Sequence, residues 1–117
     1  MDNLIEKIKK CRDYNEAGMI LCHNGVVRET SRNGKKVSGL SVKVDSALLN
    51  QVMQKYKKYP GIIEILIEIK ENQKLSVGDD LMKLVVAGDI RENVITALAG
   101  ALNEIKKSVT SKTEFFI

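Results

Sequence analysis

The strongest constraint on the fold is a long amphipathic segment that runs from about residue 90 to residue 109. Its apolar residues recur every three or four positions, which predicts one helix with a single buried face. Lys106 and Lys107 fall in the last turn, where positive charge is favourable beside the negative end of the helix dipole. The apolar stripe consists of Ile90, Val94, Ala97, Leu98, Ala101, Leu102 and Ile105.

The rest of the sequence alternates between helical and strand-like segments. Apolar spacing predicts helices at about residues 2–14 and 45–58, with Asp2 and Asp45 or Ser46 as N-caps. We expect the first two strands to pair as a hairpin across the polar loop 29–36. This order predicts an α+β fold of the α/β-hammerhead type, with three helices and a mixed or antiparallel sheet, as a single domain over residues 1–117. The expected strands are 17–27, 37–45, 62–70, 81–88 and a tail strand at 114–117.

Composition excludes several classes of function. Apolar residues make up 44% of the chain, yet no apolar run is long enough to cross a bilayer, and the charged N-terminus differs from a signal peptide. We therefore expect a cytoplasmic protein without a membrane partner. The net charge is +4, but basic and acidic residues are interleaved and only 4% of residues are aromatic. The sequence therefore predicts no nucleic-acid partner.

The cysteines and the single histidine do not predict a metal site. Cys11 and Cys22 lack the number and spacing of a disulfide scaffold or of a metal-ligand set, so we expect free thiols. His23 has no neighbouring ligand residues and reads as an ordinary strand residue. We expect no metal and no cofactor.

Excess positive charge is concentrated in two places, residues 28–36 and 106–112. Such local clusters favour one anionic ligand over a long polyanion. The first cluster lacks the glycine spacing of a phosphate-binding P-loop, so nucleotide hydrolysis has no support.

Two ordered motifs resemble the MoaE family, the large, catalytic subunit of molybdopterin synthase. The segment AGMILCHNGVVRETSRNGKKVSGL is similar to the opening strand and loop of the family, and KLSVGDDLMKLVVAGDIRENVITALAGALNEIKKSV is similar to its later strand and long helix. The resemblance spans about residues 17–109. The matching positions are Gly25, Val27, Arg28, Val37, Leu40, Leu75, Gly78, Asp79, Arg91 and Lys106.

This resemblance implies a function and a set of partners. It implies a homodimer that receives the Gly-Gly C-terminal tail of a ubiquitin-like small subunit. Sulfur would pass from a thiocarboxylate on that tail to a cyclic pterin phosphate precursor. By position in the family pattern, Lys106 is the expected catalytic lysine, with Lys112 as a substitute for the second one. Arg28 and Arg91 are the expected anion-binding residues, and all the cations would meet at one pocket.

The chain departs from the family pattern near its C-terminus. There the family has Val-Pro-x-Trp-Lys, whose lysine is the second catalytic cation. This chain keeps Val109 but has Thr113 at the position of that lysine, with Lys112 one residue earlier. A shift of one residue in a strand reverses the face to which a side chain points.

Two other departures affect the expected site. Residues 70–73, KENQ, replace a His-Arg-Ile-Gly stretch, and His23 stands where the family has phenylalanine. The departures leave two alternatives open: a non-catalytic MoaE-like binding or scaffold protein, and an unrelated anion-binding module. Each expected site residue also has a simpler interpretation, as a solvated cation or as a helix-terminal charge.

Overall fold

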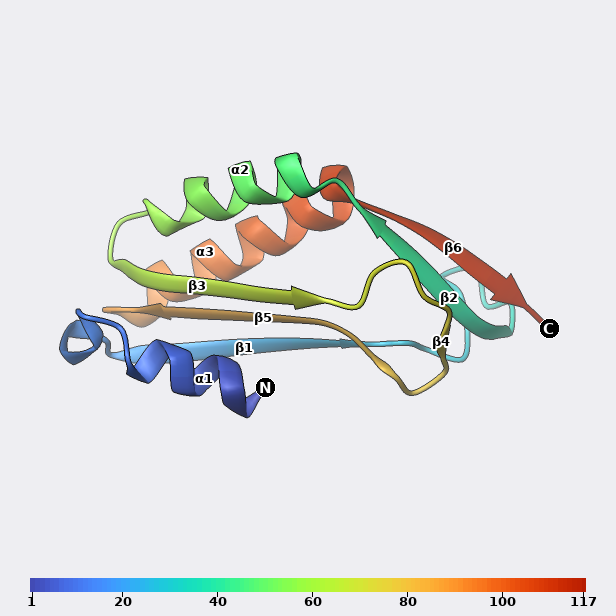
Figure 1. Ribbon diagram of the computed structural model, residues 1–117, viewed down its shortest axis with the longest axis horizontal. Helices are drawn as coiled ribbons and strands as arrows, with labels where there is room; N and C mark the ends of the chain where they lie inside the picture. The colour runs from blue at the N-terminus through green and yellow to red at the C-terminus, as the bar shows by residue number, and fades with distance from the viewer.

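The computed structural model describes all residues, 1–117, as three α-helices and two antiparallel sheets (Figure 1). The molecule is elongated, with extents of 48 × 25 × 23 Å. The α+β fold expected from the sequence is confirmed, and every strand pair is antiparallel. None of the helices has both the length and the apolar character needed to span a membrane. The elements are α1 (Asp2–Lys9), the 3-10 turn η1 (Tyr14–Glu16), β1 (Met19–Val26), β2 (Val37–Val44), α2 (Ser46–Lys57), β3 (Ile62–Ile69), β4 (Leu75–Ser76), β5 (Asp80–Gly88), α3 (Arg91–Glu104), the π-helical turn η2 (Ile105–Val109) and β6 (Thr110–Phe116).

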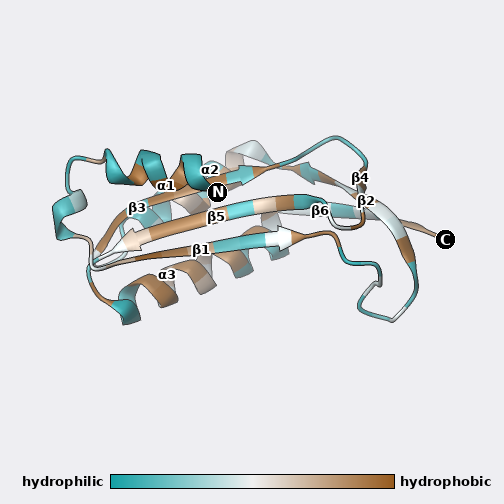
Figure 2. Cartoon of the chain, turned by 90° about the horizontal axis from the view of Figure 1, so that it is seen from below, coloured by the Kyte–Doolittle hydropathy of each residue, from teal (hydrophilic) through white to brown (hydrophobic).

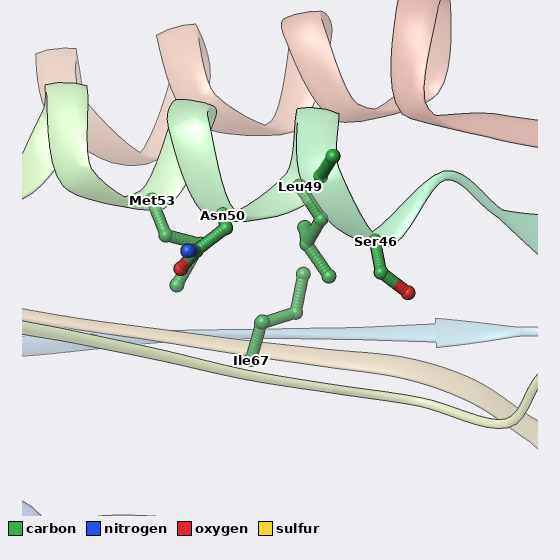
Figure 3. Close-up of a pocket in the computed structure, with 6 residues that line it drawn as sticks. Ser46, Leu49, Asn50, Met53 and Ile67 are labelled. Carbon is green, nitrogen blue, oxygen red and sulfur yellow. The ribbon is translucent and has the colours of Figure 1, made fainter.

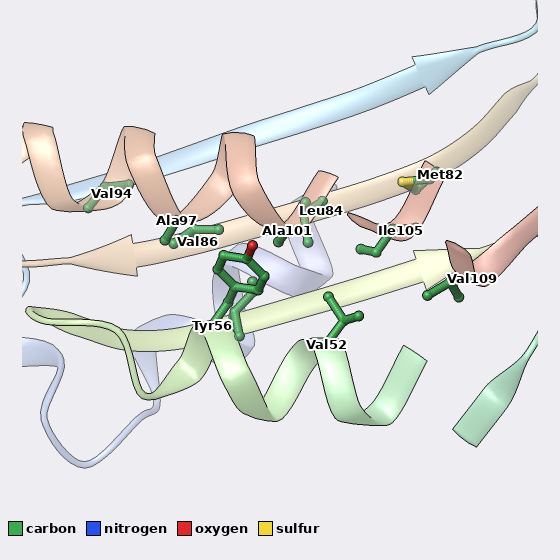
Figure 4. Packing of buried hydrophobic residues seen from close by; sticks show 11 residues of the cluster. Val52, Tyr56, Met82, Leu84, Val86, Val94, Ala97, Ala101, Ile105 and Val109 are labelled. Carbon is green, nitrogen blue, oxygen red and sulfur yellow. The ribbon is translucent and has the colours of Figure 1, made fainter. Parts of the chain in front are cut away.

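The larger sheet has the strand order β1-β5-β3 and forms the centre of the molecule. Its middle strand is covered on both faces, which explains the unbroken apolar run in its sequence. On one face, Leu84 and Val86 pack with α2 and α3 (Figure 4). On the other face, Val85 and Ala87 pack with α1. The main cluster consists of Val52, Tyr56, Ile65, Met82, Leu84, Val86, Val94, Ala97, Ala101, Ile105 and Val109.

The smaller sheet has the strand order β4-β2-β6 and lies at one end of the molecule (Figure 2). It has a separate small core of Val27, Leu40, Val42 and Leu75. The C-terminal residues join this sheet, because β6 pairs with β2 from Thr110 opposite Val44 to Phe116 opposite Val37. The apolar tail is therefore part of a strand, and its last two side chains, Phe116 and Ile117, remain exposed.

The expected hairpin between the first two strands is wrong. β1 pairs with β5, and β2 pairs with β4 and β6. Near the loop, the two segments share only an isolated bridge between Thr30 and Lys36. A β-bulge between Gly25 and Val26 interrupts the first sheet at the end of β1. Since a bulge bends a strand and ends regular pairing, the following strand enters the second sheet.

The expected helix boundaries are partly corrected. The first helix ends at Lys9 instead of about residue 14, and Met1 is the N-cap instead of Asp2. Asp45 is the N-cap of α2, as expected, and its carboxylate accepts a hydrogen bond of 3.1 Å from the amide of Leu48. The regular part of α3 ends at Glu104, five residues before the expected end, and continues as the π turn. Cys11 and Cys22 are free thiols, as expected.

Candidate anion-binding site

β1 and α3 run in the same direction from starts that lie near each other. β1 begins beside Gly88, and α3 begins three residues after Gly88. From there β1 extends towards Val26 while α3 extends towards the π turn, and α3 packs against β1. The loop that contains Arg28 follows β1 directly at the far end (Figure 1). Val27, just before Arg28, packs in the core of the smaller sheet, so the loop with Arg28 lies at the end of the molecule that holds this sheet.

His23 points from β1 towards the layer that contains α3. Side chains alternate along a strand, and Met19 and Leu21 on the same face belong to the cluster shared with α2 and α3. His23 lies opposite Leu84, a fully buried member of that cluster. The imidazole is therefore directed into the interior between the sheet and α3.

The imidazole of His23 lacks a hydrogen-bond partner. Its Nε2 atom is buried and is the one buried side-chain nitrogen or oxygen without a partner. A Cβ atom added at Gly25 would lie 3.4 Å from Nε2, so the glycine keeps the space beside the ring free of a side chain. Burial lowers the pKa of His23 below its ordinary value of 6.5, and the positive charge of Lys106 lowers it further. We therefore describe His23 as a neutral imidazole near a lysine.

Lys106 lies in the π-helical turn that ends the long helix. Its neighbour Ile105 is fully buried and, with Val109, points into the main core, which anchors the turn (Figure 4). Lys106 itself is exposed. Single π turns inside helices occur frequently at functional sites, because the extra residue changes the direction of the side chains. The turn therefore holds Lys106 on a rigid support.

Arg28 and Lys106 form no ion pair, whereas the other two expected site residues each lie near a carboxylate. Arg28 is exposed, and no carboxylate lies within ion-pair distance of Arg28 or Lys106. Arg91 lies 3.7 Å from Glu92, and Lys112 lies 3.9 Å from Glu114. The first two cations are thus free to meet an external anion.

Arg91 does not join Lys106 within this chain. It is the first residue of α3, whereas Lys106 follows the last turn of that helix. At 1.5 Å per residue, the two positions are about 20 Å apart along the helix axis. The expected convergence of Arg28, Arg91 and Lys106 is therefore not found in the single chain, and the anion-binding role of Arg91 stays a prediction.

Lys112 and Thr113 point to opposite sides of the smaller sheet. Lys112 lies opposite the buried Val42 on β2, and Thr113 lies opposite Ser41. Residues directly opposite each other in an antiparallel pair share one face, and neighbours along a strand alternate. The family pattern has a lysine at Thr113, so Lys112 presents its amine on the other face. Its catalytic role stays a prediction.

A polar groove lies where the π turn passes into β6. It has a volume of about 360 Å³, and its rim includes the exposed amine-bearing residue Lys43. A larger groove of about 470 Å³ lies between α2 and β3 (Figure 3). That second groove is lined by Ser46, Ala47, Leu49, Asn50, Met53 and Ile67, none of which is titratable. None of the expected site residues lines either groove, and the first groove is lined by Lys43, Val44, Asp45, Ser108, Val109, Thr110 and Ser111.

Comparison with known proteins identifies the family. The family model described as MoaE protein matches residues 2–108, which is most of the chain and includes Arg28, Arg91 and Lys106. The chain belongs to the MoaE family. A search of curated proteins gave no match.

Solved structures of MoaE and molybdopterin synthase proteins share the fold. Molybdopterin synthase from Staphylococcus aureus is 24% identical with a TM-score of 0.73, over 87% of this chain and 77% of that chain. The complex of subunits 1 and 2 of molybdopterin-converting factor from Helicobacter pylori is 17% identical with a TM-score of 0.71, over 98% and 82%. The MoaE protein from Burkholderia ambifaria is 12% identical with a TM-score of 0.75, over 98% and 81%.

Sequence reasoning missed the buried position of the His23 ring. The signal was partly available, because strand alternation places His23 on the same face as the apolar Leu21. What the alternation did not reveal is which helix covers that face. The burial of its Nε2 atom became visible only with the pairing of β1 to β5 and the packing of α3 on β1.

Proposed function

We propose that this protein is the large subunit of a molybdopterin synthase and acts in molybdenum cofactor biosynthesis in the cytoplasm. Its membership of the MoaE family supports this role. The reaction would transfer sulfur from the thiocarboxylate tail of a ubiquitin-like small subunit to a cyclic pterin phosphate precursor. Residues 1–117 would act as one MoaE-like unit, in a homodimer. The structure from Helicobacter pylori is a complex of both subunits of molybdopterin-converting factor, which supports a small-subunit partner for this protein.

In this proposal Lys106 is the catalytic lysine. The observation that carries it is an exposed lysine on a π turn anchored in the core and free of any ion pair. The resemblance of the sequence to the family implies a catalytic lysine at this position. An ammonium group stabilises the negative charge that develops on a carbonyl oxygen during acyl transfer. Arg28, equally free of carboxylates, would hold a phosphate or carboxylate through charge-assisted hydrogen bonds.

Reconstitution tests the proposed activity. The purified protein is mixed with a thiocarboxylated small subunit and the cyclic pterin phosphate, and the dithiolene product is detected by mass spectrometry. We expect product with the wild-type protein and far less with Lys106→Gln. The absence of product from a folded wild-type protein that binds the small subunit would refute the catalytic role.

A second candidate is a non-catalytic MoaE-like protein that binds the small subunit or serves as a scaffold. The specific observation in its favour is the placement of Lys112, which is paired with Glu114 and faces away from the side of Thr113. The site then lacks the second lysine of the family pattern. Rescue of molybdoenzyme activity in cells without a large subunit would exclude this candidate.

A further inference from the structure

The polar groove beside the π turn is built on paired backbone. It lies where β2, β6 and the end of the long helix meet (Figure 1). Lys43 on β2 lies directly opposite Ser111 on β6 in the antiparallel pair. The amide of Asp45 donates a hydrogen bond of 2.9 Å to the carbonyl of Val109, which joins the end of β2 to the π turn. The groove therefore has a floor held by main-chain hydrogen bonds.

Three side chains of this groove have unused hydrogen-bond donors. Lys43 is its one cation, and no carboxylate lies within ion-pair distance of the amine. The serine and threonine hydroxyls that donate hydrogen bonds within the chain are those of Ser38 and Thr110. The hydroxyls of Ser108 and Ser111, which also line the groove, are thus free to donate to a ligand.

The single carboxylate of the groove is already engaged. Asp45 is the N-cap of α2, and its Oδ1 atom accepts a hydrogen bond of 3.1 Å from the amide of Leu48. The positive end of the helix dipole offsets the negative charge of a carboxylate in this position. The groove therefore presents one ammonium group and two hydroxyls, with a carboxylate whose charge is compensated by the helix.

Lys43 also differs from the other lysine of these two strands. Because Lys43 lies opposite Ser111, both side chains are on the face of the smaller sheet that Thr113 shares. Lys112 lies on the opposite face, 3.9 Å from Glu114. Of the two lysines, Lys43 is the one with an amine free of carboxylates.

We propose that this groove binds a phosphate group, held by the ammonium of Lys43 and by the hydroxyls of Ser108 and Ser111. A phosphate has three strong acceptor oxygens, which matches three donors, and a lysine ammonium binds it as a compact point charge. The inference rests on the proposed function for the source of the phosphate, the cyclic pterin phosphate. It adds a substrate-binding residue to that function, since neither Arg28 nor Lys106 lines the groove.

Binding of inorganic phosphate tests the groove directly. Amide signals of the ¹⁵N-labelled protein are recorded by NMR during the titration, with sodium chloride at equal ionic strength as the reference. We expect saturable shifts centred on Lys43, Ser108 and Ser111. Lys43→Gln should weaken the binding about tenfold, because a charge-assisted hydrogen bond is lost. Shifts that do not saturate, or an unchanged affinity in Lys43→Gln, would overturn the proposal.

Two further variants separate a groove from general attraction by positive charge. Lys74→Gln removes the same charge near the other end of the smaller sheet, where the amine lies 4.8 Å from the centroid of the Phe115 ring. Its affinity should stay within about twofold of wild type. The double variant Ser108→Ala with Ser111→Ala keeps the charge and should weaken binding about fivefold. Equal losses in Lys43→Gln and Lys74→Gln would contradict the proposal, as would an unchanged affinity in the double serine variant.

Acetate is the probe that distinguishes phosphate from a carboxylate. With fewer oxygens, acetate cannot use all three donors and should bind at least about threefold more weakly than phosphate. Equal affinities would overturn the assignment of the groove to phosphate.

The failure of this inference is separable from the failure of the proposed function. The titration requires neither the small subunit nor the pterin, so it decides the binding even if the protein forms no product. If product is formed, Lys43→Gln should raise the KM for the cyclic pterin phosphate about tenfold and leave kcat within about threefold. An unchanged KM would overturn the assignment of the bound phosphate to the pterin.

Discussion

The two ends of α3 each have a cation, but they are built differently. At the start of the helix, Arg91 pairs with Glu92, and the carboxylate of Asp89 accepts hydrogen bonds from the amide of Ile90 and the side chain of Asn93. These contacts pair the polar side chains at the start of the helix with one another, although no side chain caps the free amides of the first turn. At the other end, Lys106 has no carboxylate partner, and its positive charge adds to the burial that lowers the pKa of His23, whose Nε2 atom is unpartnered.

The difference suggests a structural role for the residues at the start of α3 and a functional role for those at its end. The polar side chains at the N-terminal end have partners within the chain, and the turn between α2 and β3 lies beside them, with Gly61 at a φ of 75°. The C-terminal end leaves hydrogen-bonding and charge capacity unused, which has a cost unless a ligand or partner uses it. We therefore expect mutations at the first end to change stability and mutations at the second end to change activity.

The largest expected effect is the loss of activity in Lys106→Gln. Removal of a group that stabilises transition-state charge typically lowers the rate about 10²–10³-fold. The measurement is the initial rate of dithiolene formation in the reconstituted reaction. Because Lys106 is exposed, the thermal unfolding midpoint should change little.

Lys107→Gln is the matched control for this experiment, since it changes the net charge equally and leaves Lys106 in place. Its rate should stay within about threefold of wild type. If Arg91→Gln lowered the rate of dithiolene formation as much as Lys106→Gln, the division between the two ends would be contradicted. That result would indicate that Arg91 completes a site on a second copy.

At the N-terminal end, Gly61→Ala should reduce the free energy of unfolding by roughly 2–4 kcal/mol. The positive φ of Gly61 disfavours any side chain, and an added Cβ would also collide with the side chains of Asp89 and Asn93. Urea denaturation measures the change.

Gly34→Ala isolates the contribution of that collision. Gly34 has a similar φ of 81°, but nothing lies within 4 Å of an added Cβ. Gly34→Ala should therefore reduce the free energy of unfolding by only about 1–2 kcal/mol, which is the contribution of the backbone conformation. If both variants lost the same free energy of unfolding, the side chains of Asp89 and Asn93 would have moved to relieve the collision.

The elements that the sequence predicted well are those defined by local patterns. The stripe of α3 from Val94 onwards and the capping of α2 by Asp45 each depend on residues within a few positions of one another, although Ile90, expected in the stripe, is an exposed N-cap. The partner of β1 could not be predicted this way. Alternation indicates which face of a strand is buried but not which strand lies beside it, and β1 pairs with β5 about sixty residues later.

The same distinction applies to the candidate site. Lys106 was predicted from a motif on one helix, and the structure places it on a π turn free of ion pairs. His23 was interpreted as an ordinary strand residue, because the burial of its Nε2 atom depends on the packing of α3 against β1. Arg91 was expected near Lys106 because both belong to one sequence motif. The motif does not indicate that a whole helix separates them in space.

A smaller effect is expected from restoring the lysine of the family pattern. Thr113→Lys places an amine on the face of β6 that Lys112 does not occupy. If the site uses a second cation there, the rate of dithiolene formation should rise by up to about tenfold, which corresponds to ~1.4 kcal/mol. Ser111→Lys, on the same face and two residues earlier, is the control. An equal gain in the control would show that the effect is one of general positive charge.

The smallest expected effect is a pH dependence of stability that His23 alone contributes. Its pKa is lowered in the folded protein and close to 6.5 in the unfolded chain, so both states are neutral above about pH 7.5. As the pH falls through 6.5, the unfolded chain binds the proton first, and the free energy of unfolding decreases until the folded protein is protonated as well.

His23→Gln isolates this contribution from that of the carboxylates. The decrease between pH 7.5 and 5.5 should be smaller in His23→Gln than in wild type, as measured by urea denaturation at each pH. The difference should stay below the ~1.4 kcal/mol of a full pKa unit, because the ring is partly solvated. Asp89 and Glu104, whose pKa values are lowered by their hydrogen-bond partners, remain ionised throughout this range and cancel in the comparison. A decrease of equal size in both proteins would mean that the imidazole is as well solvated when folded as when unfolded. The second end of α3 would then resemble the first, with no unused polar group.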